Sequence, residues 1–141
     1  MRKILVPLDG SENSSRALTF AVAVAQDNPV IELFIVTVVL PIESAMVREF
    51  VSEERINKHY YEEAMKILAP AEQLASEAGV RFTAKTLAGT PAQKIAECVD
   101  TEHCDHIVMG TRGLGNLGNL VLGSIATKVI HLVDVPVTVV K

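Results

Sequence analysis

The sequence has few cysteines, no cluster of basic residues and no excess of positive charge. Cys98 and Cys104 are its two cysteines, too few for a disulfide framework. The 13 Lys and Arg residues are scattered and are outnumbered by 17 Asp and Glu, which leaves a formal charge of -4. Because binding to a nucleic-acid backbone needs clustered Lys and Arg, nucleic acid is disfavoured as a main partner.

Long apolar runs are also lacking. No run approaches the ~20 residues that a membrane span requires. The first run, residues 4–8, is too short for the core of a signal peptide and ends at a turn. We therefore expect a cytoplasmic protein that has no membrane partner. The length of 141 residues and the 49% hydrophobic content are those of one ordinary globular domain, spanning residues 1–141.

Two common catalytic signatures are missing. There is no Gly-Lys-Ser/Thr of a Walker A loop and no G-x-S-x-G nucleophile elbow. Four potential metal ligands do fall within nine residues, namely Cys98, His103, Cys104 and His106. Their spacing fits no common zinc pattern, so we interpret them as structural residues.

What the sequence does have is a regular alternation of strand and helix patterns. Short apolar runs predict strands at residues 4–8, 30–40, 106–109 and 135–140, and alternating residues on one face predict a fifth strand at 81–87. Helical spacing of apolar residues predicts four helices: one capped by Ser11 or Ser14, one over 51–78, one opened by Thr90 and Pro91, and one over 125–133. Pro70 should kink the second helix or split it, and residues 41–50 are interpreted as a loop.

This alternation predicts an α/β fold. Strands that are apolar on both faces are typical of a parallel sheet covered by helices on both sides. Right-handed crossovers then give a single-domain, doubly wound, five-stranded parallel sheet. Such sheets bind ligands at the carboxyl ends of the strands, where the winding reverses.

A glycine-rich segment follows the fourth predicted strand. Residues 110–124 read GTRGLGNLGNLVLGS and hold five of the eight glycines. Glycine lets a ligand approach the backbone, and successive free N–H groups bind anions. The segment ends where a helix begins, and a helix N-terminus adds further donors and partial positive charge. It therefore indicates a phosphate site, although a connection without a ligand explains the same glycines.

The chain resembles the universal stress protein family over its whole length. Gly110-Thr-Arg-Gly113, nine residues and Gly123-Ser124 match the G-x2-G-x9-G-S/T motif of the ATP-binding members. Further similar pieces are residues 4–11, 89–91, 105–110 and 135–137. The resemblance implies a five-stranded parallel sheet of the adenine-nucleotide alpha-hydrolase-like type, and a stress-response regulator that binds ATP, with magnesium bridging the phosphates.

The resemblance also implies roles for the residues at matching positions. Around adenosine they are Pro7, Leu8, Asp9, Val38, Met109 and Gly110; around the phosphates they are Arg112, Gly113, Gly123, Ser124 and Ile125. Taken alone, Asp9 is better interpreted as a turn former or helix cap. One departure is the spacer, where many members have basic residues and this chain has Asn116, Gly118 and Asn119, so that Arg112 is the one charged residue of the motif.

The last predicted strand is an edge strand in the family's strand order. Its residues Val135, Val137 and Val139 favour a homodimer through this strand, as in many members of the family. Three functions stay open from the sequence: a nucleotide switch with slow hydrolysis or none, an enzyme such as an ATPase, and a nucleotide-free module that binds an unknown protein partner. No catalytic residue stands out for the second.

Overall fold

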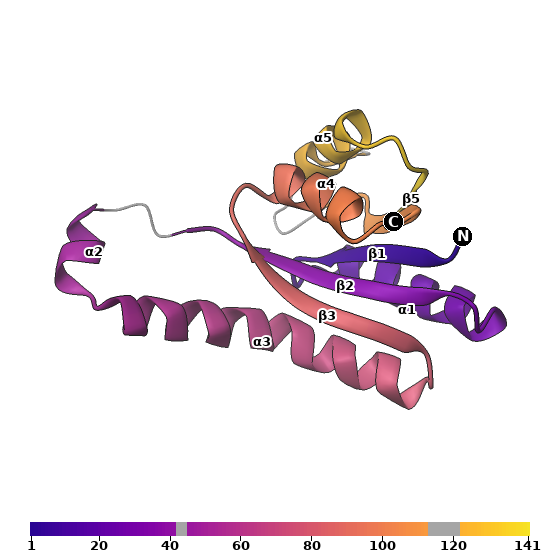
Figure 1. The fold of residues 1–141 in the computed structure, drawn as a ribbon, viewed down its shortest axis with the longest axis horizontal. Coiled ribbons are helices and arrows are strands. Elements are labelled where there is room, and N and C mark those ends of the chain that lie inside the picture. The colour runs from indigo at the N-terminus through magenta and orange to yellow at the C-terminus, as the bar shows by residue number, and fades with distance from the viewer. Residues whose placement is uncertain (42–44, 113–121) are drawn as a thin grey trace.

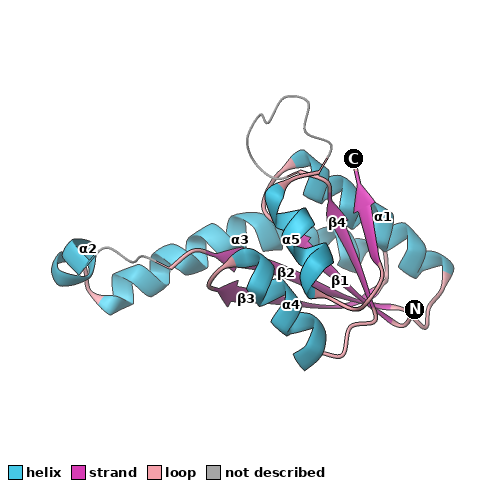
Figure 2. Cartoon of the chain, turned by 90° about the horizontal axis from the view of Figure 1, so that it is seen from above, coloured by secondary structure: helices cyan, strands magenta, loops and turns pink. Residues whose placement is uncertain are grey.

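The computed structural model describes residues 1–41, 45–112 and 122–141. They form a five-stranded sheet with helices on both faces (Figures 1 and 2). The strands are β1 (Lys3–Leu8), β2 (Glu32–Val39), β3 (Arg81–Ala88), β4 (His106–Gly110) and β5 (Val137–Val140). The helices are α1 (Glu12–Asp27), α2 (Ala45–Phe50), α3 (Glu53–Glu77), α4 (Pro91–Thr101) and α5 (Ser124–Leu132).

The predicted parallel, doubly wound sheet is confirmed. The strand order is β3-β2-β1-β4-β5, and all four strand pairs are parallel. The chain winds outward from β1 to β3 and then crosses to the other side of β1 to form β4. The switch point therefore lies between β1 and β4, where a doubly wound sheet opens a crevice at its carboxyl edge.

Two apolar cores lie on opposite faces of the sheet. Ile4 and Val6 face α1 and α3, whereas Leu5 faces α4 and α5. All three side chains have 0% exposure. Because a central parallel strand is covered on both sides, β1 is a continuous apolar run with no polar alternation. Figure 1 shows α4 and α5 on one side of the sheet and α3 on the other.

The structure differs from the sequence-based expectation at two places after β2. Of the kink or split expected at Pro70, the split is wrong, because α3 is one helix of 25 residues. Its buried stripe continues on both sides of the proline, with Leu68 before it and Ala71 and Ala75 after it, so packing outweighs one lost backbone hydrogen bond. Residues 41–50 are not all loop, since α2 occupies Ala45–Phe50. α2 and the start of α3 extend beyond the sheet (Figure 2).

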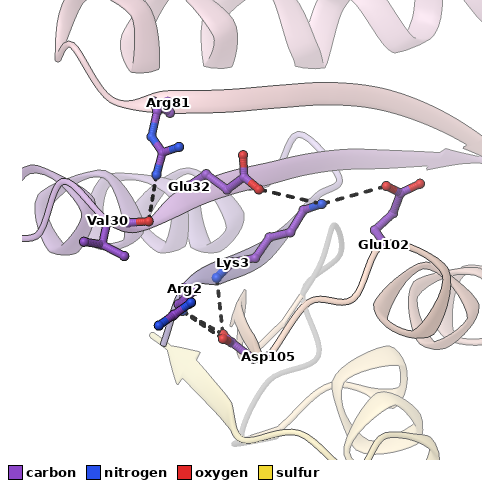
Figure 3. Close-up of polar contacts among 7 residues, drawn as sticks. All are labelled: Arg2, Lys3, Val30, Glu32, Arg81, Glu102 and Asp105. Carbon is purple, nitrogen blue, oxygen red and sulfur yellow. Dashed lines mark hydrogen bonds and ion pairs between the residues drawn. The ribbon is translucent and has the colours of Figure 1, made fainter.

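Polar contacts join the strands at the amino edge of the sheet (Figure 3). The Asp105 carboxylate accepts hydrogen bonds from the backbone N–H of Arg2, at 2.8 and 3.1 Å, and from that of Lys3. The Lys3 ammonium lies 3.8 Å from Glu32 and 3.9 Å from Glu102. These contacts tie β1 to β2 and to the turn before β4, at the end of the sheet opposite the crevice.

Candidate nucleotide pocket

A pocket of about 300 Å³ lies at the carboxyl ends of β1 and β4. Its described lining includes ten of the eleven residues predicted to bind nucleotide, namely Pro7, Leu8, Asp9, Val38, Met109, Gly110, Arg112, Gly123, Ser124 and Ile125. The eleventh, Gly113, lies outside the described residues. Residues from four separate stretches of the chain are thus brought together at the switch point.

The sequence reasoning missed five lining residues: Ser14, Pro91, Ile95, Thr111 and Ala126. Sequence patterns place Pro91 only at a helix start, and Ile95 only on the inner face of that helix. A signal for both was available, because a helix that follows a parallel strand begins at the carboxyl edge of the sheet. Thr111 occupies an unspecified position of the motif, and no sequence signal singles it out.

Asp9 closes the turn between β1 and α1. Its Oδ1 accepts a hydrogen bond of 2.9 Å from the Ser11 N–H, and Gly10 between them has a φ of 84°. Ser11 is the N-cap of α1 and accepts from the Ser14 N–H at 3.2 Å. Asp9 is therefore a turn former, as its residue type indicates, and it also lines the pocket. A carboxylate can accept several hydrogen bonds, so this role leaves acceptor capacity for a ligand.

The N-terminus of α5 opens onto the pocket. Gly123 is the N-cap, and its carbonyl accepts from the Thr127 N–H at 3.0 Å and from the Thr127 hydroxyl at 2.9 Å. Ser124, Ile125 and Ala126 form the first turn, and all three line the pocket. The N–H groups of a first turn have no intrahelical acceptor, and the helix dipole adds positive charge. With the Arg112 guanidinium, this end of the pocket suits an anion.

Gly110 lets β4 approach α1 very closely. A Cβ at this position would lie 2.9 Å from the Asn13 carbonyl carbon and 2.9 Å from its Cβ. Contacts below 3.0 Å with backbone atoms require the backbone itself to move. Gly110 therefore sets the distance between the tip of β4 and the first turn of α1, which form adjoining walls of the pocket.

The four potential metal ligands noted in the sequence do not line the pocket; they are Cys98, His103, Cys104 and His106. Cys98 and Cys104 are buried among the apolar side chains under α4 and α5. Burial raises the pKa of the Cys98 thiol and raises the pKa of Cys104 to about 12, so neither is a ready nucleophile. Within the described part of the chain, no three His, Cys, Asp or Glu side chains are placed to hold a metal ion.

The helices of the described residues include none that is long and apolar enough to cross a membrane.

Comparison with known proteins identifies relatives along the whole chain. Universal stress protein MJ0531 of Methanocaldococcus jannaschii is 36% identical over 146 residues, covering 99% of this chain and 82% of the relative. A universal stress protein of Thermus aquaticus, encoded in a QAH/OAS sulfhydrylase 3' region, is 38% identical over 141 residues, covering 99% and 98%.

Solved structures share the fold. The hypothetical protein MJ0577 superposes with a TM-score of 0.86 at 30% identity, covering 99% of this chain and 95% of that one. Two universal stress proteins at 23% identity were solved with nucleotides. One is in complex with cAMP, with a TM-score of 0.73 and coverage of 99% and 97%. The other, from Archaeoglobus fulgidus, is in complex with dAMP, with a TM-score of 0.71 and coverage of 100% and 98%.

A sequence model of the universal stress protein family matches residues 1–141, in agreement with these relatives and with the doubly wound sheet. The chain belongs to the universal stress protein family.

Proposed function

We propose that this protein binds ATP, together with Mg²⁺, in the pocket at the tips of β1 and β4, and acts as a stress-response switch rather than a fast catalyst. One observation carries the proposal: ten residues that match the family's nucleotide positions line a single pocket. The volume of about 300 Å³ is at the lower end of the range for small-molecule sites.

The chemistry of the pocket supports an adenine nucleotide. Val38 and Met109 offer apolar surface to a base, and the Asp9 carboxylate offers acceptors to ribose hydroxyl groups. The first turn of α5, the Ser124 hydroxyl and the Arg112 guanidinium offer donors to phosphates. A ligand that combines a flat apolar ring, hydroxyl groups and phosphates matches this set. The cAMP and dAMP complexes of the two family members agree with an adenine nucleotide as the class of ligand.

Magnesium is included in the proposal because the negative charge of a triphosphate needs a counterion. Arg112 is the one charged residue between positions 110 and 124. A triphosphate carries more negative charge than one guanidinium and a helix dipole offset. A divalent cation held by the phosphates would neutralise part of this charge and fix the phosphate conformation. Ser124 and Asp9 are the two residues of the predicted set whose side chains carry oxygen, the ligand atom that Mg²⁺ prefers.

A switch fits the pocket better than rapid hydrolysis. Asp9 is the one carboxylate among the described lining residues, and its Oδ1 already accepts from the Ser11 N–H. In the proposed complex the remaining acceptors of Asp9 bind ribose hydroxyl groups, so no carboxylate among the described lining residues is left to act as the general base for an attacking water. We expect steady-state turnover of ATP to be slow or undetectable. Fast turnover by the purified protein, lost in the Asp9→Asn variant, would contradict the switch.

A homodimer through β5 is the second part of the proposal. β5 is an edge strand, and Val139 on it is 39% exposed. An edge strand offers unpaired backbone groups to another strand, and a second copy of β5 supplies the same apolar surface.

The nucleotide proposal is tested by denaturing the purified protein, identifying released nucleotides by mass spectrometry, and titrating the nucleotide-free protein with Mg-ATP. ATP released at near one per chain, or saturable binding in the titration, agrees with it. No released nucleotide together with a silent titration contradicts it, and that pair of results favours the nucleotide-free interaction module.

A further inference from the structure

Thr111 is a buried residue whose backbone hydrogen bond connects the start of the motif, at residues 110–112, to its end at Gly123. Its carbonyl accepts a hydrogen bond of 2.6 Å from the Gly123 N–H, and its own N–H donates to the Val140 carbonyl at 2.8 Å. Thr111 is 4% exposed. Arg112, next in the chain, and Ser124, next after Gly123, are the residues proposed to hold phosphates. The position of Thr111 therefore sets the positions of both groups relative to each other.

The Thr111 side chain is fixed by α1. Its Oγ1 accepts a hydrogen bond of 3.0 Å from the Asn13 Nδ2, and Asn13 is 8% exposed. The Asn13 Oδ1 accepts from the Arg16 guanidinium, which directs the amide nitrogen toward Thr111. Arg16 in turn donates from Nε to the Lys141 carbonyl at 2.6 Å. A chain of polar contacts thus runs from the end of β5 through α1 to the motif.

Close packing leaves this contact little freedom. The same Asn13 lies against Gly110, where a Cβ would come within 2.9 Å of it. A hydrogen bond between two buried polar groups, on elements already in van der Waals contact, restricts both elements to one arrangement. Rigid support of this kind is what a phosphate site needs, because its donors must be placed before the ligand arrives.

We propose that Asn13 and Thr111 are positioning residues that hold Arg112 and the N-terminus of α5 in register for the phosphates of the nucleotide. This inference rests on the proposed function. Neither residue needs to touch the phosphates through its side chain for this role. The hydroxyl of Thr111 acts through Asn13, and its backbone acts through Gly123.

The test compares ATP with adenosine. Thr111→Val keeps the branched shape and the backbone bonds of Thr111 but removes the acceptor of Asn13. We expect Mg-ATP to bind roughly tenfold more weakly, as for one lost buried hydrogen bond, while adenosine affinity stays within about twofold. Thr111→Ser keeps the hydroxyl and should restore ATP affinity. A purely structural role for Thr111 would weaken both ligands alike or lower only the melting temperature.

The partner variant and a control complete the experiment. Asn13→Ala should reproduce the loss for ATP, and the double variant should lose little more, because both changes break one contact. Thr138→Val removes a hydroxyl on β5 that contacts the His106 Nε2 on β4 at 2.7 Å, and neither of these residues lines the pocket. It should leave both affinities unchanged.

The outcomes separate this inference from the proposed function. A wild-type protein that binds neither ATP nor adenosine contradicts the proposed function itself. A wild-type protein that binds ATP, with Thr111→Val and Asn13→Ala binding it equally well, overturns the positioning role alone. Equal losses for ATP and adenosine in folded variants also overturn it.

Discussion

At the scale of single residues, Ser124 is the most direct probe of the phosphate end. It begins α5 and lines the pocket, and its hydroxyl can donate to an anionic oxygen. Ser124→Ala should weaken Mg-ATP binding by about 1.5–3 kcal/mol, the range for a hydrogen bond to a charged group. Isothermal titration measures this change, and circular dichroism checks that the fold is retained. Ser76→Ala, an exposed serine on α3, is the matched control and should bind like the wild type.

Most of the candidate pocket could be predicted from sequence because its residues match positions of the family that the chain resembles. Asp9 shows the limit of reasoning without that resemblance, since its turn with Ser11 explains its residue type fully. Ser14 and Thr111 could not be predicted as lining residues. Their places in the pocket depend on the close contact of β4 with α1 at Gly110, which is a tertiary contact that no local pattern reports.

At the scale of elements, the spacing between β4 and α1 decides the shape of the pocket. Gly110→Ala would place a Cβ 2.9 Å from the Asn13 backbone, so α1 must shift. We expect a loss of about 1–3 kcal/mol in the free energy of unfolding, as for overpacked sites, together with weaker nucleotide binding. Thermal melts and titration measure the two effects.

Gly79→Ala is the control for this prediction. Gly79 has a φ of 72°, and a Cβ added there would meet no atom within 4 Å beyond its chain neighbours, so alanine strains the backbone without a clash. This variant should lose about 1 kcal/mol of stability and keep its nucleotide affinity. Unchanged affinity in Gly110→Ala as well would show that the β4–α1 spacing does not shape the site.

The partly buried His106 on β4 should make the free energy of unfolding depend on pH. Burial lowers the pKa of His106, with the Asp105 carboxylate opposing the shift. The unfolded chain then binds a proton at higher pH than the folded protein, so stability rises with pH through this range and falls on acidification below about pH 6.5. In urea unfolding experiments between pH 5 and 7, the free energy of unfolding should change less with pH for His106→Gln than for the wild type.

Elements with a clear apolar pattern could be predicted, whatever their length, and α2, which shows no such pattern, could not. β1, β2 and β4 follow from apolar runs because strands covered on both faces of a parallel sheet need them. The edge strand β3 follows instead from alternating exposed and partly buried residues. α2, with six residues, is too short to show helical periodicity. The unbroken course of α3 through Pro70 depends on the packing of Leu68 and Ala71 against the sheet, which local propensity does not include.

At the scale of the whole molecule, the proposed dimer requires that the edge strand β5 can pair with β5 of a second copy. A lysine on an edge strand opposes pairing with a second copy because two like charges would be brought together. Val139→Lys should convert the dimer to a monomer in light scattering at micromolar concentration. Val30→Lys, at a valine that is 58% exposed and distant from β5 in the sheet order, should remain dimeric. A wild-type protein that is monomeric under these conditions contradicts the dimer.

The proposed function places an adenine nucleotide across the switch point of the sheet. The most direct test is a crystal structure of the protein with Mg²⁺ and a non-hydrolysable ATP analogue at saturating concentration. We expect the phosphates at the first turn of α5 beside Ser124 and Arg112, and the adenosine between Asp9, Val38 and Met109. Nucleotide bound elsewhere, or none bound in this pocket at saturation, would contradict the proposal.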